Sequence, residues 1–144
     1  MKRVKIYIGT SAKSPKTQCA RGIYVLATET GRGVADLTQE EVLEEVTANQ
    51  AELQILAAAL GRLREPCGLV IYTDSAYLNA GLMDWLPAWK RADWRKADGR
   101  RIRNAEEWQE LDRLLEGCEV ETKLGEWHPY RKWMDAELRR KQDV

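Results

Sequence analysis

The chain has few of the side chains that build metal cages, disulfide frameworks and histidine-based catalytic sites. It contains three cysteines and one histidine, His128. An odd number of cysteines without C-x-x-C spacing argues against a disulfide framework and against a cysteine zinc site. A single histidine nearly excludes a histidine metal cage or a catalytic triad. Any catalysis must therefore come largely from carboxylates.

Long apolar runs and phosphate-binding loops are also missing. No stretch reaches the roughly 18 apolar residues that a membrane span needs. There is no glycine-rich phosphate loop and no G-x-S-x-G motif. The start, MKRVKIYIGT, is basic and then alternates between apolar and polar residues, which predicts a strand rather than a signal peptide. We therefore expect a cytoplasmic protein that does not enter a membrane.

The formal net charge is zero, with 23 basic and 23 acidic side chains, but the two signs are separated along the chain. Residues 85–103 carry seven basic and two acidic side chains, a local net charge of +5. We call this segment the handle. Its tryptophans, Trp85, Trp89 and Trp94, alternate with the cations, which favours binding to a phosphate backbone. The alternative is a solvated amphipathic helix with its tryptophans in the core, where we expect Trp85 and Trp108.

The order of predicted elements indicates an α/β fold in a single domain spanning residues 1–144. Strands are expected at residues 4–8, 23–28, 34–37, 68–72 and 120–124. Helices are expected from 47–49 to about 63, over 76–85, from 104 to about 116, and over 130–141. Short turns between the first three strands predict an antiparallel meander, and the later crossovers predict a mixed sheet flanked by helices.

Helix starts are marked by polar residues that accept hydrogen bonds from free backbone N–H groups. Thr47 or Asn49 can cap the first helix, and Ser75 the second. Asn104, with Glu107 three residues later, resembles a capping box. The acidic stretch at residues 36–45 is expected to form a solvated loop and the start of a helix.

Three carboxylates lie at positions where α/β proteins can perform chemistry. Asp74 follows a strongly apolar strand, Glu52 lies near the start of an apolar helix, and Asp135 lies in the last helix. Each also has a purely structural interpretation. Asp74 can cap a helix, and Asp135 can be a solvated helix residue. Glu52 can be an acid of the first turn that the helix dipole stabilises.

Taken together, four segments resemble ribonuclease H of type 1: NQAELQILAAAL, VIYTDSAYL, MDAELRR, and the longer WLPAWKRADWRKADGRRIRNAEEWQELD. The resemblance extends from about residue 4 to residue 140. It implies a ribonuclease H-like fold with a five-stranded mixed sheet. It also implies hydrolysis of the RNA strand of RNA–DNA hybrids, with two Mg²⁺ (or Mn²⁺) ions held by clustered carboxylates.

Within the resemblance, Glu52, Asp74 and Asp135 match three of the family's four metal-binding and catalytic acids. The fourth is absent, because Gly9 lies where the family has its first aspartate. The resemblance therefore implies an endonuclease with a degenerate, weakened site. The family's mobile histidine falls at Gly125, so His128 is a further catalytic candidate, with a plain surface-loop histidine as the alternative.

The predicted nucleic-acid surface combines one residue that matches the family's minor-groove contacts with the exposed part of the handle. Its candidate residues are Asn49, Trp89, Lys90, Arg91, Trp94, Arg95, Lys96, Arg100 and Arg101. The expected partner is an RNA–DNA hybrid or double-stranded RNA, bound by a monomer. The alternatives are a catalytically inactive module that binds the same nucleic acids, or a protein-interaction module that uses the acidic stretch.

Overall fold

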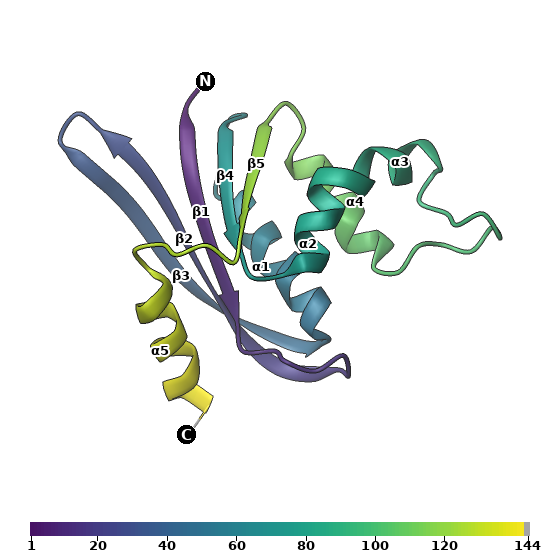
Figure 1. Cartoon of the computed structure of the whole chain (residues 1–144), viewed down its shortest axis with the longest axis horizontal. Helices are drawn as coiled ribbons and strands as arrows, with labels where there is room; N and C mark the ends of the chain where they lie inside the picture. The colour runs from purple at the N-terminus through teal and green to yellow at the C-terminus, as the bar shows by residue number, and fades with distance from the viewer. Residues whose placement is uncertain (143–144) are drawn as a thin grey trace.

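The computed structural model describes residues 1–142, with side chains described through residue 140. Its centre is a five-stranded sheet in the order β3-β2-β1-β4-β5 (Figure 1). The strands are β1 Arg3–Thr10, β2 Gln18–Thr30, β3 Gly33–Val46, β4 Gly68–Thr73 and β5 Glu119–Leu124. The first three strands are antiparallel, whereas β1–β4 and β4–β5 are parallel. The structure therefore confirms the predicted mixed sheet.

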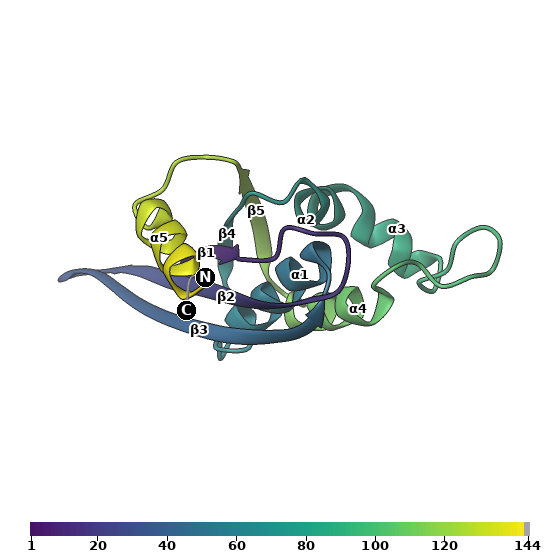
Figure 2. The same ribbon diagram turned by 90° about the horizontal axis from the view of Figure 1, so that it is seen from below.

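Helices cover the two faces of the sheet unequally. The helical elements are α1 Ala48–Leu60, α2 Ala76–Ala80, the π-helical turn η1 Gly81–Trp85, α3 Leu86–Arg91, α4 Ala105–Leu114 and α5 Arg131–Gln142. Figure 2 shows α1, α2 and α4 on one face and α5 on the other. Alternation along β1 explains this division, since Ile6 and Ile8 enter the core under α1 while Tyr7 packs beneath α5.

Helix α1 begins at a full capping box. The Thr47 side chain accepts a hydrogen bond from the Gln50 N–H, and the Gln50 side chain accepts one from the Thr47 N–H. This confirms Thr47 as the cap. Leu53 and Leu56 are fully buried against the sheet, and each contributes about 1.5–3 kcal/mol by leaving water. The cap and this buried face fix where Glu52, in the first turns, points.

The acidic stretch does not form the predicted loop and helix start. Residues 36–45 lie within β3, which pairs with β2 in register from Thr30↔Gly33 to Gln18↔Val46. Most of the strand's side chains are exposed, because β3 is an edge strand and much of its surface faces solvent. The alternation of apolar and polar residues that reveals a half-buried strand is therefore weak in β3. For this reason the predicted strand at 34–37 was too short.

The predicted helix over residues 76–85 is present, and from Gly81 onward it continues as the π-helical turn η1. A Cβ at this position would lie 2.1 Å from Cη2 of Trp108, so only glycine allows that indole to pack there. Trp108 is fully buried, as predicted, and its Nε1–H donates to the Tyr77 hydroxyl at 2.9 Å. Asn104 donates to the same hydroxyl at 3.1 Å. Tyr77 thus holds the helices on both sides of the handle together.

Two sequence-based assignments in the handle region were wrong. Asn104 makes no side-chain capping bond to α4, because its backbone is left-handed and its amide is used on Tyr77. Trp85 is 56 % exposed rather than buried. Its ring stacks edge-on against Trp89, which in turn contacts Trp108.

Within the described residues, no helix is both long and apolar enough to span a membrane.

Candidate active site

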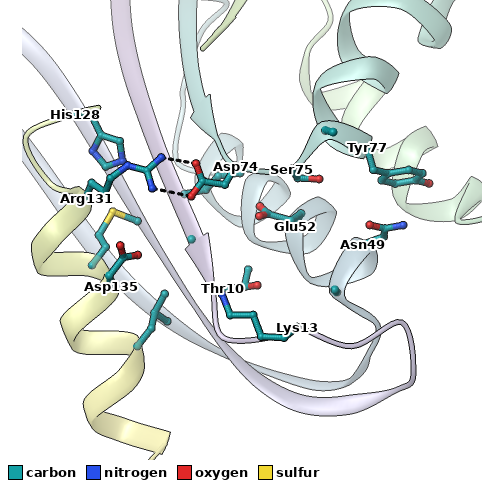
Figure 3. Close-up of a pocket in the computed structure, with 17 residues that line it drawn as sticks. Thr10, Lys13, Asn49, Glu52, Asp74, Ser75, Tyr77, His128, Arg131 and Asp135 are labelled. Carbon is teal, nitrogen blue, oxygen red and sulfur yellow. Dashed lines mark hydrogen bonds and ion pairs between the residues drawn. The ribbon is translucent and has the colours of Figure 1, made fainter. Parts of the chain in front are cut away.

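A polar pocket of about 330 Å³ lies between the ends of β1 and β4, the start of α1 and the inner side of α5 (Figure 3). Its walls include all the acids that the sequence singled out, Glu52, Asp74 and Asp135, together with His128 and Asn49. Parallel strands β1 and β4 end at the same edge of the sheet, which brings side chains from distant parts of the sequence together.

Glu52 supplies the most buried carboxylate of this pocket. Its Oε2 atom is inaccessible to solvent and has no hydrogen-bond partner among the described residues. Burial raises the pKa of Glu52 to about 7, with a further contribution from the negative charge of Asp74, while Lys13 acts in the opposite direction. A buried carboxylate oxygen without a partner is a ready ligand for a cation or a proton.

Asp74 follows β4 and is bound by Arg131, the first residue of α5. Arg131 Nη1 donates to Asp74 Oδ2 at 2.9 Å, and Nη2 donates to Asp74 Oδ1. The dashed lines in Figure 3 mark this two-bond fork. The hydrogen bonds to Asp74 raise the pKa of Arg131. Both oxygens of Asp74 therefore face a guanidinium that belongs to the protein itself.

Asp135 and Arg131 lie four residues apart on α5 and so share one side of that helix. Asp135 acts electrostatically on Arg131 and on His128. It is exposed and lines the pocket from the side opposite α1. The negative charge of Asp135 thus adds to that of Asp74 around the same guanidinium.

His128 is buried rather than a surface-loop histidine. Its ring lies 4.6 Å from that of Tyr7 and 5.6 Å from that of Tyr72, between centroids. Its Nδ1 accepts a hydrogen bond from the Tyr130 N–H at 3.2 Å. Burial, assisted by the charge of Arg131, lowers the pKa of His128. The imidazole therefore lines the pocket in its neutral form and fixes the loop that precedes α5.

At Gly9, side chains of α5 fill the space beside the strand. A Cβ at this position would lie 3.3 Å from Cε of Met134 and 3.4 Å from Cδ1 of Leu138. The alternation of β1 directs position 9 toward α5, as it does Tyr7. A side chain at position 9 would thus lie on the same side of the sheet as Asp135, next to Met134 and Leu138 of α5.

The resemblance noted in the sequence implies divalent metal ions, and the unpartnered oxygen of Glu52 suits such an ion. In the arrangement observed, only part of the set is free to hold one. Gly9 supplies no ligand, and both oxygens of Asp74 are used by Arg131. Within the described part of the chain, no three His, Cys, Asp or Glu side chains are close enough together to hold a metal ion.

A second hollow of about 510 Å³ joins the pocket to the handle. It shares Lys13, Ala48 and Asn49 with the carboxylate pocket and extends to Arg103 and Asn104. Asn49 is exposed at the boundary between the two. The carboxylates and the basic segment, which are far apart in the sequence, therefore form one continuous concave surface.

The handle projects away from the sheet beyond α3 (Figures 1 and 2). Its outer part is a small hairpin closed by a bridge between Arg95 and Arg101. Its cations are all exposed, namely Lys90, Arg91, Arg95, Lys96, Arg100, Arg101 and Arg103. Three of them are paired with acids, Lys90 with Asp112, Arg100 with Asp98 and Arg101 with Glu106.

The tryptophans of the handle have different environments. Trp94 is only 8 % exposed and belongs to the main core, so its indole supports the handle from inside, and its predicted part in the nucleic-acid surface stays a prediction. Its carbonyl accepts from the Ile102 N–H at 2.9 Å, which ties the two ends of the hairpin together. Trp89 is partly buried between Trp85 and Trp108 and braces α3.

Two charged residues of the pocket escaped the sequence reasoning, Arg131 and Lys13. The spacing of Arg131 from Asp135 would have placed both on one face of a helix, and this was the available signal. No local pattern indicates that Arg131 pairs with Asp74, 57 residues away. Lys13 lies in a polar loop whose path is set by tertiary contacts.

Solved structures share the fold over nearly the whole chain. LC9-RNase H1, described as a type 1 RNase H with the type 2 active-site motif, superposes with a TM-score of 0.77 at 18 % identity, covering 97 % of this chain and 72 % of that one. LC11-RNase H1 in complex with an RNA/DNA hybrid gives a TM-score of 0.65 at 13 % identity, covering 96 % and 99 %. These likenesses confirm the ribonuclease H-like fold.

Sequence comparison gives closer relatives over part of the chain. The ribonuclease H of Cupriavidus pinatubonensis is 39 % identical over 82 residues, which is 57 % of this chain and 53 % of that protein. The chain thus spans about half the length of the curated relatives it matches. The sequence model of the RNase H family matches residues 1–128, and the chain belongs to that family.

Proposed function

We propose that this chain binds RNA–DNA hybrids across the carboxylate pocket and the handle, and that it hydrolyses the RNA strand at a reduced rate. The observation that carries the proposal is the continuous concave surface. Lys13, Ala48 and Asn49 line both hollows and so link Glu52 and Asp74 to the handle. Such a surface suits a nucleic-acid backbone that passes from the basic segment to the carboxylates.

The side chains along this surface match the chemistry of a hybrid duplex. Hybrid and A-form helices present a wide minor groove with 2′-hydroxyls, and proteins recognise it mainly by shape and backbone contacts. The amide of Asn49 can donate and accept at that groove, while Lys13 and Arg103 offer charges to phosphates. Family membership and the hybrid bound by LC11-RNase H1 support the same partner.

The cleavage assay uses a hybrid with a labelled RNA strand, highly purified protein, and Mg²⁺ or Mn²⁺. We expect slow cleavage of the RNA strand that Asp74→Asn abolishes. Asp84→Asn is the matched control, because Asp84 is an exposed aspartate outside the pocket. Absence of cleavage by wild-type protein at high concentrations of both metals would remove hydrolysis from the proposal.

Binding without cleavage is the second candidate, and two observations favour it. Gly9 provides no carboxylate, and Asp74 is paired with Arg131. In this case the hybrid binds with a strong dependence on salt, and its RNA strand stays intact in every metal tested. Failure to bind any nucleic acid would leave the exposed acidic side chains of β3 as the candidate surface for a protein partner.

The handle can be tested apart from catalysis. Replacing Arg95, Lys96 and Arg101 together by alanine should weaken hybrid binding at least tenfold and reduce the slope of log affinity against log salt by about 2. The triple alanine variant of Lys2, Arg3 and Lys5 removes three exposed cations elsewhere and is the matched control. Wild-type affinity in the handle variant would contradict the proposed interface.

A further inference from the structure

The guanidinium of Arg131 occupies the edge of the Asp74 carboxylate where a divalent cation could bind both oxygens. Each of the two oxygens of Asp74 accepts from a different nitrogen of Arg131. Nη2 also donates to the backbone carbonyl of Glu126 at 3.4 Å. A planar fork of this kind engages both oxygens of the carboxylate at once, so a metal ion cannot bind both of them from this side without displacing the guanidinium.

The backbone of Arg131 is held in place by the loop before α5. The Arg131 N–H donates to the His128 carbonyl at 3.3 Å, and His128 itself is buried against Tyr7 and Tyr72. Met134, one turn further along α5, is buried in the same cluster as Tyr7. Arg131 therefore approaches Asp74 from a fixed backbone and not from a free loop.

The charges around the guanidinium are those that would otherwise attract a divalent ion. Asp74 is in direct contact with Arg131, and Asp135 acts on it from the same face of α5. The positive side chain of Arg131 thus lies next to Asp74 and Asp135. A metal ion bound beside these two acids would be repelled by it. The exposure of the pair, 30 % for the Arg131 side chain and 59 % for Asp74, allows exchange with a competing ion.

From this arrangement we infer that Arg131 is a built-in counter-cation that competes with divalent metal ions for Asp74. The inference rests on the proposed function only in taking this pocket as the metal-binding site. It makes Arg131 the residue that sets how tightly the pocket binds a divalent ion. On this inference two separable features lower the metal affinity of the pocket, the lack of a carboxylate at Gly9 and the cation at Arg131.

The test measures binding of Mn²⁺ alone, from the electron paramagnetic resonance signal of the free ion, with no nucleic acid present. We expect Arg131→Gln to bind Mn²⁺ about tenfold more tightly than wild type, because the substitution frees Asp74 and removes a repelling charge. Arg140→Gln is the matched control, since Arg140 lies on the same helix and pairs with Glu137. Adding Asp74→Asn to Arg131→Gln should abolish the gain.

Equal Mn²⁺ affinity in wild type and in a folded Arg131→Gln variant would overturn the inference. If that variant does not fold, as judged by circular dichroism, the Mn²⁺ affinity of Arg131→Lys is measured instead. Lysine keeps the charge but loses the fork, so a gain of about threefold supports competition and no gain overturns it. A rise in Mn²⁺ affinity in Arg131→Gln, without hybrid cleavage in any variant, would support the inference and refute the proposed hydrolysis. A failure of the inference and a failure of the proposed function therefore give different results.

Discussion

The buried carboxylate of Glu52 predicts that this protein becomes less stable as pH rises. The folded-state pKa of Glu52 is about 7, against an ordinary value of 4.5. The folded state therefore binds a proton more tightly than the unfolded state between these values. The contribution of Glu52 to stability is largest below pH 4.5 and declines as pH rises to 7, by about 3 kcal/mol in total.

Glu52→Gln isolates this effect, because glutamine keeps the shape of the side chain and cannot ionise. We expect the variant to match wild type near pH 4.5 and to be more stable by about 3 kcal/mol at pH 8. Urea unfolding followed by circular dichroism, in buffers that contain a chelator, gives the difference at each pH. Glu119→Gln, at an exposed glutamate, measures the effect of the same exchange on the surface.

The reasoning would be refuted if the free energies of unfolding of Glu52→Gln and wild type differed by an amount that stays constant within about 0.5 kcal/mol from pH 4.5 to 8. It would mean that the Oε2 atom is solvated or paired in solution. A difference of the opposite sign, with wild type more stable at high pH, would mean that Lys13 outweighs both burial and Asp74 at this carboxylate.

Three further predictions concern single side chains. Gly9→Asp should increase hybrid cleavage by restoring the fourth acid at a packing cost of about 1 kcal/mol, and Gly9→Ala, which adds the bulk without the charge, should not. Gly81→Ala should lower the free energy of unfolding by about 3 kcal/mol because the new Cβ meets the Trp108 ring, whereas Gly31→Ala, where a Cβ meets nothing within 4 Å, should change it little in urea titrations. Because burial lowers the pKa of His128, the folded state loses stability when pH falls below about 6.5. His128→Gln should remove that part of the loss, so that its stability relative to wild type improves from pH 7 to 5.5 in the same titrations.

The candidate site was predictable where a functional residue belongs to a strong local pattern. Asp74 follows the apolar strand β4, and Ser75 caps the next helix by accepting from the Leu78 N–H at 3.0 Å. Glu52 lies on the capped, apolar helix α1. Such patterns depend on neighbouring residues, so they place these acids at element ends before any tertiary contact is known.

The errors fall where tertiary contacts outweigh local preference. The acidic stretch is extended because it pairs with β2, although its own side chains carry little apolar alternation. Trp94 carries the sequence signature of a basic, aromatic surface and yet is buried, because it packs into the main hydrophobic core. Neither outcome follows from spacing within the segment itself.

By itself, the sequence determined the order of strands and helices and the separation of basic and acidic regions, and it predicted a site of three acids with Gly9 in place of a fourth. These depend on residue type and local periodicity. Only the tertiary structure decided that Arg131 binds Asp74, that α5 side chains close over Gly9, and that Asn49 joins the pocket to the handle. The physical reason is that a polar side chain's partner depends on which surfaces the packed core brings together, and that packing is not encoded within any single segment.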